Sequence, residues 1–233
     1  MSIVTCWKQS GTLILSTDSR STNLDGGAVS DTETKIFEVG PGTFIAHVGT
    51  TCASEFQTER ARKSAAGTTD IQAIAREIGR VSVPFLDMLL ERLRAKHDEV
   101  SRKKVSGEEL LQGYTLVGRS AGKLGYVTQT YWAQPDGTVK YFTDPYFDSP
   151  RKVAVHAGTP IELLKKISVE LCNDPATWRD PMDEVALRFL ETAKRVTPCI
   201  GGDWQVVKLN SAGTHWVSLP TWAKPEGGKS ESL

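Results

Sequence analysis

Three groups of residues near the start of the chain could together perform nucleophilic catalysis. Ser2 follows the initiator methionine, the triplet Asp18-Ser19-Arg20 ends an apolar run, and Lys35 precedes a second apolar run. A serine in the second position usually lets the methionine be removed, which leaves a residue with both a hydroxyl and a free α-amine. Our working hypothesis is that Ser2 is a nucleophile that uses its own amine as base, tuned by Asp18 and Lys35.

This chemistry depends on the free terminal amine. A serine hydroxyl is a poor nucleophile at its ordinary pKa and needs a base to take its proton. A free α-amine has a pKa of about 7.7–8.0, so at neutral pH it can accept that proton directly or through one water. An acylated nitrogen has no basic lone pair, so the hypothesis requires that Met1 is removed.

The elements that carry these residues are expected to be strands. Ile3 to Lys8 and Thr12 to Ser16 are short β-branched or apolar runs on either side of Ser10-Gly11, which predicts a hairpin. The second run shows no polar alternation, so we expect that strand to be covered on both faces. Two more strands are expected at residues 35–39 and 43–46.

Two pairs of helices are expected, each following a set of strands. The first pair spans about Ala53 to Ala66 and Asp70 to Glu99; the longer helix has an apolar stripe, with Pro84 expected to kink it. The second pair begins at Thr159-Pro160-Ile161-Glu162 and Asp180-Pro181-Met182-Asp183, where Thr or Asp would be the N-cap and Pro the first helical residue. Further strands are expected at residues 114–118, 125–133, 138–142, 153–155, 205–209 and 215–218.

The order of these elements predicts an α+β fold in one domain. Strands buried on both faces, with helices in two separate pairs, indicate two stacked sheets between helix layers. We assign residues 1–219 to this domain. Residues 220–233 are polar and are expected to form a flexible tail.

Composition and charge indicate a soluble cytoplasmic protein and argue against two kinds of partner. Hydrophobic residues make up 39% and charged residues 24% of the chain, and the formal net charge is +0. This balance argues against binding to nucleic acid or to a membrane surface through a basic field. None of the four cysteines is in a CxxC pair, so a reduced protein is the simplest interpretation, with Cys6 and Cys199 as small core residues.

Four landmarks occur at a characteristic joint spacing. They are Leu15-Ser16-Thr17-Asp18-Ser19-Arg20-Ser21-Thr22, Thr34-Lys35-Ile36, Ile45-Ala46-His47-Val48-Gly49 and Ile200-Gly201-Gly202. With the spacing from Ser2 to the aspartate triplet, the chain resembles proteasome β-type subunits and their bacterial relatives of the HslV and Anbu kinds. The resemblance covers about residues 2 to 219.

The resemblance implies an N-terminal nucleophile (Ntn) hydrolase with a four-layer αββα sandwich of mostly antiparallel sheets. The implied activity is that of an N-terminal serine/threonine-type peptidase acting on a peptide or protein, without a metal or organic cofactor. It also implies self-association into rings that enclose the site. The sequence does not identify an ATP-dependent unfoldase partner.

The resemblance also implies roles for individual residues. Lys35 would lie beside Ser2, with Asp18 orienting it, and Arg20 belongs to the matched catalytic triplet. An ammonium at this place would lower the cost of a developing alkoxide and depress the pKa of the terminal amine. The backbone N–H of Gly49 would be an oxyanion-hole donor, and such a donor contributes roughly 3 kcal/mol in kcat.

Two further residues are expected to bind substrate. Thr22 would pair through its backbone with an extended peptide, as an added strand. His47 falls where the family lines its main specificity pocket, and a partly charged imidazole there would favour polar or acidic side chains. The alternative for His47 is a hydrogen-bonded core histidine.

Structural alternatives stay open for the other residues as well. Lys35 could be a solvated lysine at a strand start, and Asp18 and Arg20 could form an ordinary ion pair in a turn. Gly49 could simply end a strand.

One part of the family pattern is missing. Proteasome-like enzymes carry a serine, an aspartate and a second serine that hydrogen-bond the terminal amine, and the corresponding positions are Ala157, Thr197 and Ile200. These replacements should leave the amine less well oriented. His156 is a candidate substitute for the missing polar group.

Three functions therefore stand as hypotheses. The first is a proteasome-like hydrolase that cleaves peptide bonds with Ser2 as nucleophile. The second is a catalytically degenerate subunit that keeps the fold for assembly or binding. The third is an amidase that acts on a small molecule.

Overall fold

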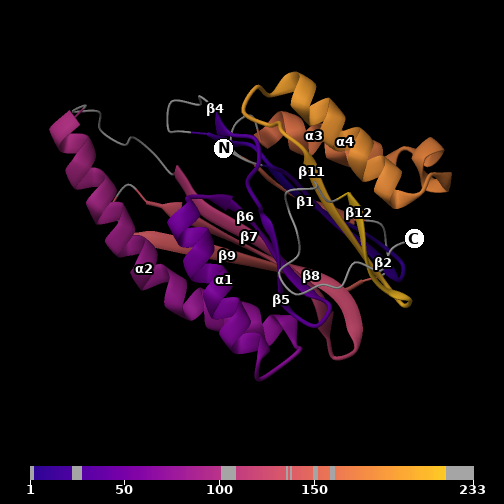
Figure 1. The fold of residues 1–233 in the computed structure, drawn as a ribbon, viewed down its shortest axis with the longest axis horizontal. Helices are drawn as coiled ribbons and strands as arrows, with labels where there is room; N and C mark the ends of the chain where they lie inside the picture. The colour runs from indigo at the N-terminus through magenta and orange to yellow at the C-terminus, as the bar shows by residue number, and fades with distance from the viewer. Residues whose placement is uncertain are drawn as a thin grey trace. The chain divides into compact units, whose positions relative to one another are not determined.

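The computed structural model describes residues 3–22, 28–100, 109–134, 136, 138–148, 152–157 and 161–218. These residues form strands and four α-helices, so the expected α+β class is confirmed (Figure 1). The expected tail at 220–233 and the expected helix start at Thr159 lie outside the described residues. So does Ser2.

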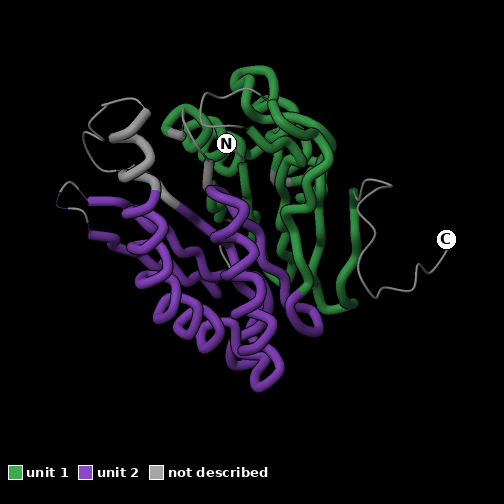
Figure 2. Tube along the Cα trace, turned by 60° about the vertical axis from the view of Figure 1, so that its left-hand side comes forward, with its two compact units in different colours: residues 1–38, 149–233 green, residues 39–148 purple. Residues whose placement is uncertain are grey.

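The chain divides into two compact units, which Figure 2 shows in green and purple. Unit 1 comprises residues 1–38 and 149–233, and unit 2 comprises residues 39–148. The two five-stranded sheets have the orders β10-β1-β2-β11-β12 and β5-β6-β7-β8-β9. The expectation that residues 1–219 form a single domain stays a prediction, because it depends on how the two units join.

The sheet of unit 1 is antiparallel at each described pairing. Its β1–β2 hairpin has Val4 opposite Thr17, so the expected N-terminal hairpin is confirmed. The expected strands at 205–209 and 215–218 pair as a second antiparallel hairpin, β11–β12, at one edge of the sheet. Successive β2 side chains from Leu13 to Asp18 are buried, which confirms that this strand is covered on both faces. The strands are β1 (Ile3–Gln9), β2 (Thr12–Asp18), β10 (Lys152–Ala157), β11 (Trp204–Asn210) and β12 (Gly213–Ser218).

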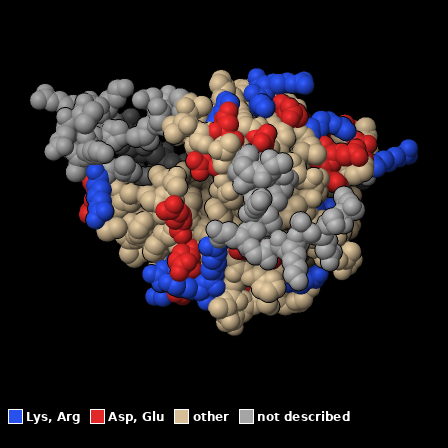
Figure 3. Space-filling model, viewed as in Figure 1, with Lys and Arg blue, Asp and Glu red and all other residues tan. Residues whose placement is uncertain are grey.

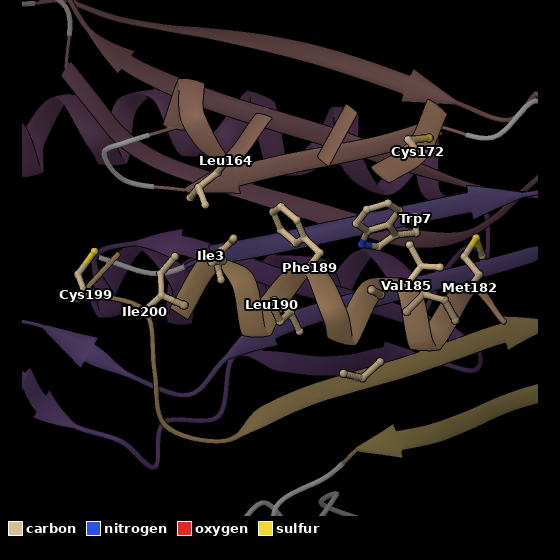
Figure 4. Close-up of a cluster of buried hydrophobic side chains, with 14 residues drawn as sticks. Ile3, Trp7, Leu164, Cys172, Met182, Val185, Phe189, Leu190, Cys199 and Ile200 are labelled. Atoms are coloured by element: carbon tan, nitrogen blue, oxygen red, sulfur yellow. The ribbon is translucent and has the colours of Figure 1, made fainter. Parts of the chain in front are cut away.

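Helix α4 (Met182–Val196) packs against β1, β2 and β11. Its apolar stripe inserts Phe189 beside Trp7, with ring centroids 5.7 Å apart in an edge-on arrangement. Figure 4 shows this cluster of buried side chains between the helix and the strands. The cluster fixes the strand that begins at Ile3, and so helps to position the N-terminal hairpin.

The start of α4 differs from the expectation. The N-cap is Pro181 rather than Asp180, and it makes no side-chain capping bond. The Asp180 carboxylate instead accepts a hydrogen bond from Arg188 at 2.9 Å, which draws it away from the helix end. A short 3₁₀ helix, η1 (Pro175–Arg179), follows α3 (Ile161–Asn173) and was not expected from the sequence.

Unit 2 places a pair of helices against its sheet. Helix α2 (Ile71–Val100) contacts β7, β8 and β9, and it continues through Pro84, so the kink expected there stays a prediction. Gly79 lets α2 approach the sheet, because a Cβ at this position would lie 3.2 Å from the Gln129 side chain. The other elements are α1 (Thr51–Ala65), β5 (Ile36–Gly40), β6 (Thr43–Gly49), β7 (Glu109–Ser120), β8 (Lys123–Ala133) and β9 (Val139–Tyr146).

Charged residues of both signs are interspersed on the face drawn in Figure 3. Within the described part of the chain, no helix is both long enough and apolar enough to cross a membrane.

Candidate functional site

The Asp18 carboxylate, at the end of β2, is the centre of the candidate site. It is fully buried and accepts three hydrogen bonds. Its Oδ1 atom accepts from the Lys35 ammonium at 2.9 Å and from the backbone N–H of Ile3 at 3.1 Å. Its Oδ2 atom accepts from the backbone N–H of Gly201 at 3.2 Å. One carboxylate therefore joins the start of β1, the segment before β5 and the loop before β11.

Lys35 is held at both its side chain and its backbone. Its side chain is only 10% exposed, and the ammonium donates to Asp18 and to the backbone carbonyl of Arg20. Its backbone N–H donates to Oε1 of Gln205 at 2.9 Å, and the Gln205 amide donates to the Glu33 carbonyl at 2.7 Å. The structure thus brings Asp18 and Lys35 together, and the alternative of a solvated Lys35 is wrong.

Burial acts on both members of this pair. It lowers the pKa of the Lys35 ammonium and raises the pKa of the Asp18 carboxyl, because each charged form is less well solvated in the interior. The attraction between the two groups opposes both shifts. A cation held this way acts on nearby groups with little screening by water, so it can stabilise a negative charge that develops close to it.

Arg20 connects the Asp18-Ser19-Arg20 triplet to the loop before β11, and its side chain does not pair with Asp18. Its guanidinium forms two hydrogen bonds to the Asp31 carboxylate, at 2.6 and 3.0 Å, and a third to the Pro198 carbonyl at 2.9 Å. Hydrogen bonding to Arg20 lowers the pKa of Asp31. The expected alternative of an ion pair between Asp18 and Arg20 is therefore wrong, because Arg20 pairs with Asp31.

Gly201 and Gly202, in the loop before β11, allow this close packing. A Cβ at Gly201 would lie 2.6 Å from the Arg20 guanidinium carbon, and one at Gly202 would lie 2.6 Å from the Asp31 carbonyl oxygen. Gly202 also has a φ of +71°, a conformation that favours glycine. The glycine pair is thus needed for the loop to contact the Asp18-Ser19-Arg20 triplet.

Ser19 completes the connection between the triplet and the loops. Its hydroxyl donates to the Asp31 carbonyl at 2.5 Å and accepts from the backbone N–H of Asp203 at 2.7 Å. Its role is therefore to hold the loop backbone.

Thr22 lies in a small two-stranded sheet. Strand β3 (Ser21–Thr22) pairs with β4 (Ala28–Ser30), with Thr22 opposite Ala28. The sequence did not indicate this pairing. The role of Thr22 in binding a peptide as an added strand stays a prediction.

His47 and Gly49 lie on β6 in unit 2. The His47 ring is buried, its Nε2 atom is 2.9 Å from the Thr58 hydroxyl, and it packs edge-on to Tyr114. Burial lowers its pKa to about 3, so the ring is neutral near pH 7. This environment fits the core-histidine alternative, and the specificity role stays a prediction.

Gly49 ends β6 with a φ of +126°, which only glycine adopts readily. The conformation explains why a glycine stands there. Its role as an oxyanion donor stays a prediction.

The positions of the missing second cluster are apolar or lack a partner. Ile200 is buried in the hydrophobic cluster of unit 1. The Thr197 hydroxyl is also buried, and it has no hydrogen-bond partner among the described residues. Ala157 ends β10, opposite Ile3. Cys6 and Cys199 are buried, as expected for small core residues, and burial raises the pKa of both thiols.

Residues that the sequence did not single out complete the site. Asp31 and Gln205 hold Arg20 and Lys35 in place. Gln205 is a fully buried polar residue of β11, and the sequence carried no local signal for its contact with Lys35. In the part of the chain that the structure describes, no cluster of His, Cys, Asp and Glu is arranged to hold a metal ion.

Comparison with known proteins does not assign the chain to a family. No protein-family model matches it, and no curated protein matches it significantly. The functional interpretation therefore rests on the chemistry and geometry of its own residues.

Proposed function

We propose that the protein is an N-terminal nucleophile hydrolase that cleaves amide bonds in peptides, on a proteasome-like four-layer αββα fold. The observation that carries the proposal is the sharing of one carboxylate oxygen. Oδ1 of Asp18 accepts from the Lys35 ammonium and from the N–H of Ile3, the residue directly after Ser2.

The shared oxygen supports a role for Lys35 at the terminus. The two hydrogen bonds measure 2.9 and 3.1 Å, so the Lys35 ammonium and the Ile3 nitrogen can be no farther apart than the sum of these distances. Ser2 is bonded to that nitrogen through its own carbonyl carbon. A buried cation at this range favours the alkoxide form of the hydroxyl and the neutral form of the amine.

The proposed reaction proceeds in two halves. In the first, the Ser2 hydroxyl gives its proton to the terminal amine while its oxygen attacks the substrate carbonyl carbon. The resulting ammonium returns the proton to the leaving nitrogen as the amide bond breaks, which leaves an ester on Ser2. In the second half, the amine takes a proton from water, the hydroxide attacks the ester, and the proton returns to the serine oxygen.

Lys35 would contribute by electrostatic stabilisation in both halves. Each half passes through an oxyanion, and a fixed positive charge in a poorly solvated place lowers the energy of such a state. Asp18 would be a positioning residue, because its carboxylate holds the Lys35 ammonium. The proposed assembly is a homo-oligomeric ring in the cytoplasm.

A degenerate subunit is the second candidate, and one observation favours it. Ile200, where the family has a serine, is buried among apolar side chains, so it offers no hydrogen bond to the terminal amine. A fold that binds or assembles without catalysis would keep the Asp18 network for its structural value alone.

Turnover of fluorogenic peptides by the purified full chain tests the proposal. We expect Ser2→Ala to abolish turnover and Lys35→Met to lower kcat by about 100-fold or more, the size typical of a lost oxyanion stabiliser. Lys165→Met, which replaces a half-exposed lysine on α3, is the control and should leave kcat unchanged.

Other outcomes would select the other functions. Turnover of small acyl amides but not of peptides would favour the amidase. A chain from which Met1 has been removed, yet which turns over neither substrate class, would be a degenerate subunit.

A further inference from the structure

Strand β9 leaves an unusually open edge on the sheet of unit 2. It is the last strand in the order β5-β6-β7-β8-β9, and among the described residues it pairs with β8 only. Helix α2 contacts this strand, and Figure 1 labels both elements. Six successive residues, 140–145, are exposed. Because successive strand residues face opposite sides of a sheet, both faces of this edge are accessible.

Two large apolar side chains lie on this edge. Phe142 is 62% exposed and Tyr141 is 45% exposed. Tyr141 stacks on Tyr131 with ring centroids 5.6 Å apart, and Phe142 lies opposite Thr130 on the other face. Soluble proteins usually protect an exposed edge strand with charged residues or proline, and β9 carries Lys140, Asp144 and Pro145. The exposed aromatic residues beside them are what indicates an interaction surface on this edge.

The charges along β9 are self-complementary about Phe142. If two copies of the strand pair in antiparallel fashion with Phe142 opposite Phe142, then Lys140 of each copy faces Asp144 of the other. If the antiparallel pairing is instead centred one residue or half a residue away from Phe142, Lys140 of each copy no longer faces an aspartate of the other copy. Opposite charges across antiparallel strands favour pairing, and like charges disfavour it.

Pro145 is compatible with this register. It falls opposite Val139, at the end of the paired stretch, so its missing N–H removes hydrogen bonds only at the two ends. Residues 140–144 contain no proline, so each of them carries a backbone N–H.

We infer that β9 is a self-association edge, and that its occupant is the β9 strand of a second copy of this chain. The pairing is antiparallel, is centred on Phe142, and joins two five-stranded sheets across a two-fold axis. Such a contact is isologous, since each copy contributes the same surface. The inference is independent of the proposed catalytic activity.

Charge reversal with compensation tests the register. Lys140→Asp places aspartate opposite Asp144, and Asp144→Lys places lysine opposite Lys140. We expect either change to raise the dimer dissociation constant of the full chain at least about tenfold in sedimentation velocity, and the double swap to restore it to within about threefold. Lys165→Asp, a charge reversal on α3, should leave the constant unchanged. A monomeric wild-type chain, or a double swap as weak as the single variants, would overturn the inference.

Cysteine cross-linking tests the same contact in any larger assembly. In a Cys52→Ser background, which removes the exposed cysteine, Phe142→Cys places two thiols opposite each other across the axis. Lys140→Cys places them four residues apart along the strand, too far for a disulfide. We expect mild oxidation of the folded protein to give a covalent dimer with cysteine at 142 but not at 140. No dimer in either variant, or equal amounts in both, would contradict the register. An edge that instead pairs with a strand of another protein would give no homodimer at 142.

Discussion

Replacing Lys35 by methionine removes the ammonium that contacts the Asp18 carboxylate. The carboxylate keeps the N–H groups of Ile3 and Gly201 as donors, but its charge stays fully buried without the cation that offset it. Removing one partner of a buried ion pair typically costs about 3–5 kcal/mol. Because two backbone donors remain and because the carboxyl can take up a proton, we expect a loss of about 3 kcal/mol near pH 8.

The loss should depend on pH in a defined direction. Burial already raises the pKa of Asp18, while Lys35 lowers it, so the variant raises that pKa further. A carboxyl whose pKa is higher in the folded state than in the unfolded state stabilises the fold most at low pH, and this stability is lost as pH rises through the folded pKa. The variant should therefore lie closer to the wild type at pH 5 than at pH 8.

Urea unfolding, followed by circular dichroism and tryptophan fluorescence at pH 5 and pH 8, measures this loss. The comparison is valid where the slope against urea is the same for both proteins. Lys165→Met is the matched control, since it removes a half-exposed lysine of unit 1, and should change stability by less than about 0.5 kcal/mol.

Comparing the stability of the double variant Asp18→Asn/Lys35→Met with that of Lys35→Met tests whether the ion pair stabilises the site. The double variant removes both charges, so it should be more stable than Lys35→Met alone at pH 8. A Lys35→Met loss below about 1 kcal/mol, or a double variant no more stable than the single one, would show that the pair does not hold the site together.

Three further changes have expected outcomes. His47 has a pKa of about 3 in the fold, so it contributes stability that is present above pH 6.5 and lost as pH falls toward 3. In the wild type this should lower the free energy of unfolding by about 2 kcal/mol between pH 7 and pH 5. In His47→Gln, urea unfolding should show no such decrease. Gly202→Ala should lower Tm more than Gly122→Ala, because both glycines have a positive φ but only Gly202 has a neighbour within reach of a Cβ; equal shifts would contradict the steric reason. Gln205→Leu should destabilise the chain by about 2 kcal/mol or more, and more than Gln205→Glu, which keeps the acceptor for the Lys35 N–H; chemical denaturation separates the two.

The helices and hairpins that the sequence predicted are those with a local signal. The β1–β2 hairpin follows from two apolar runs around a turn, and α2 follows from the apolar stripe along its length. The boundaries were less predictable. Asp180 has the residue type of an N-cap, but its contact with Arg188 on the next turns of α4 draws it away.

The contacts within the site depend on residues far apart in the chain, and these were only partly predictable. The Asp18–Lys35 pair was expected because of a family resemblance, not because of a local pattern. The partner of Arg20 was not, because Asp31 has no feature that distinguishes it from other loop aspartates. Gln205 reaches Lys35 across 170 residues, and no periodicity reports such a bond.

Mapping a covalent adduct on the N-terminal residue tests the central claim most directly. The full chain is treated with a β-lactone or epoxyketone probe, and its intact mass and N-terminal peptide are measured by mass spectrometry. We predict that Met1 is absent, that the adduct lies on Ser2, and that Ser2→Ala abolishes labelling. Retention of Met1, or labelling that persists in Ser2→Ala, would contradict catalysis by an N-terminal serine.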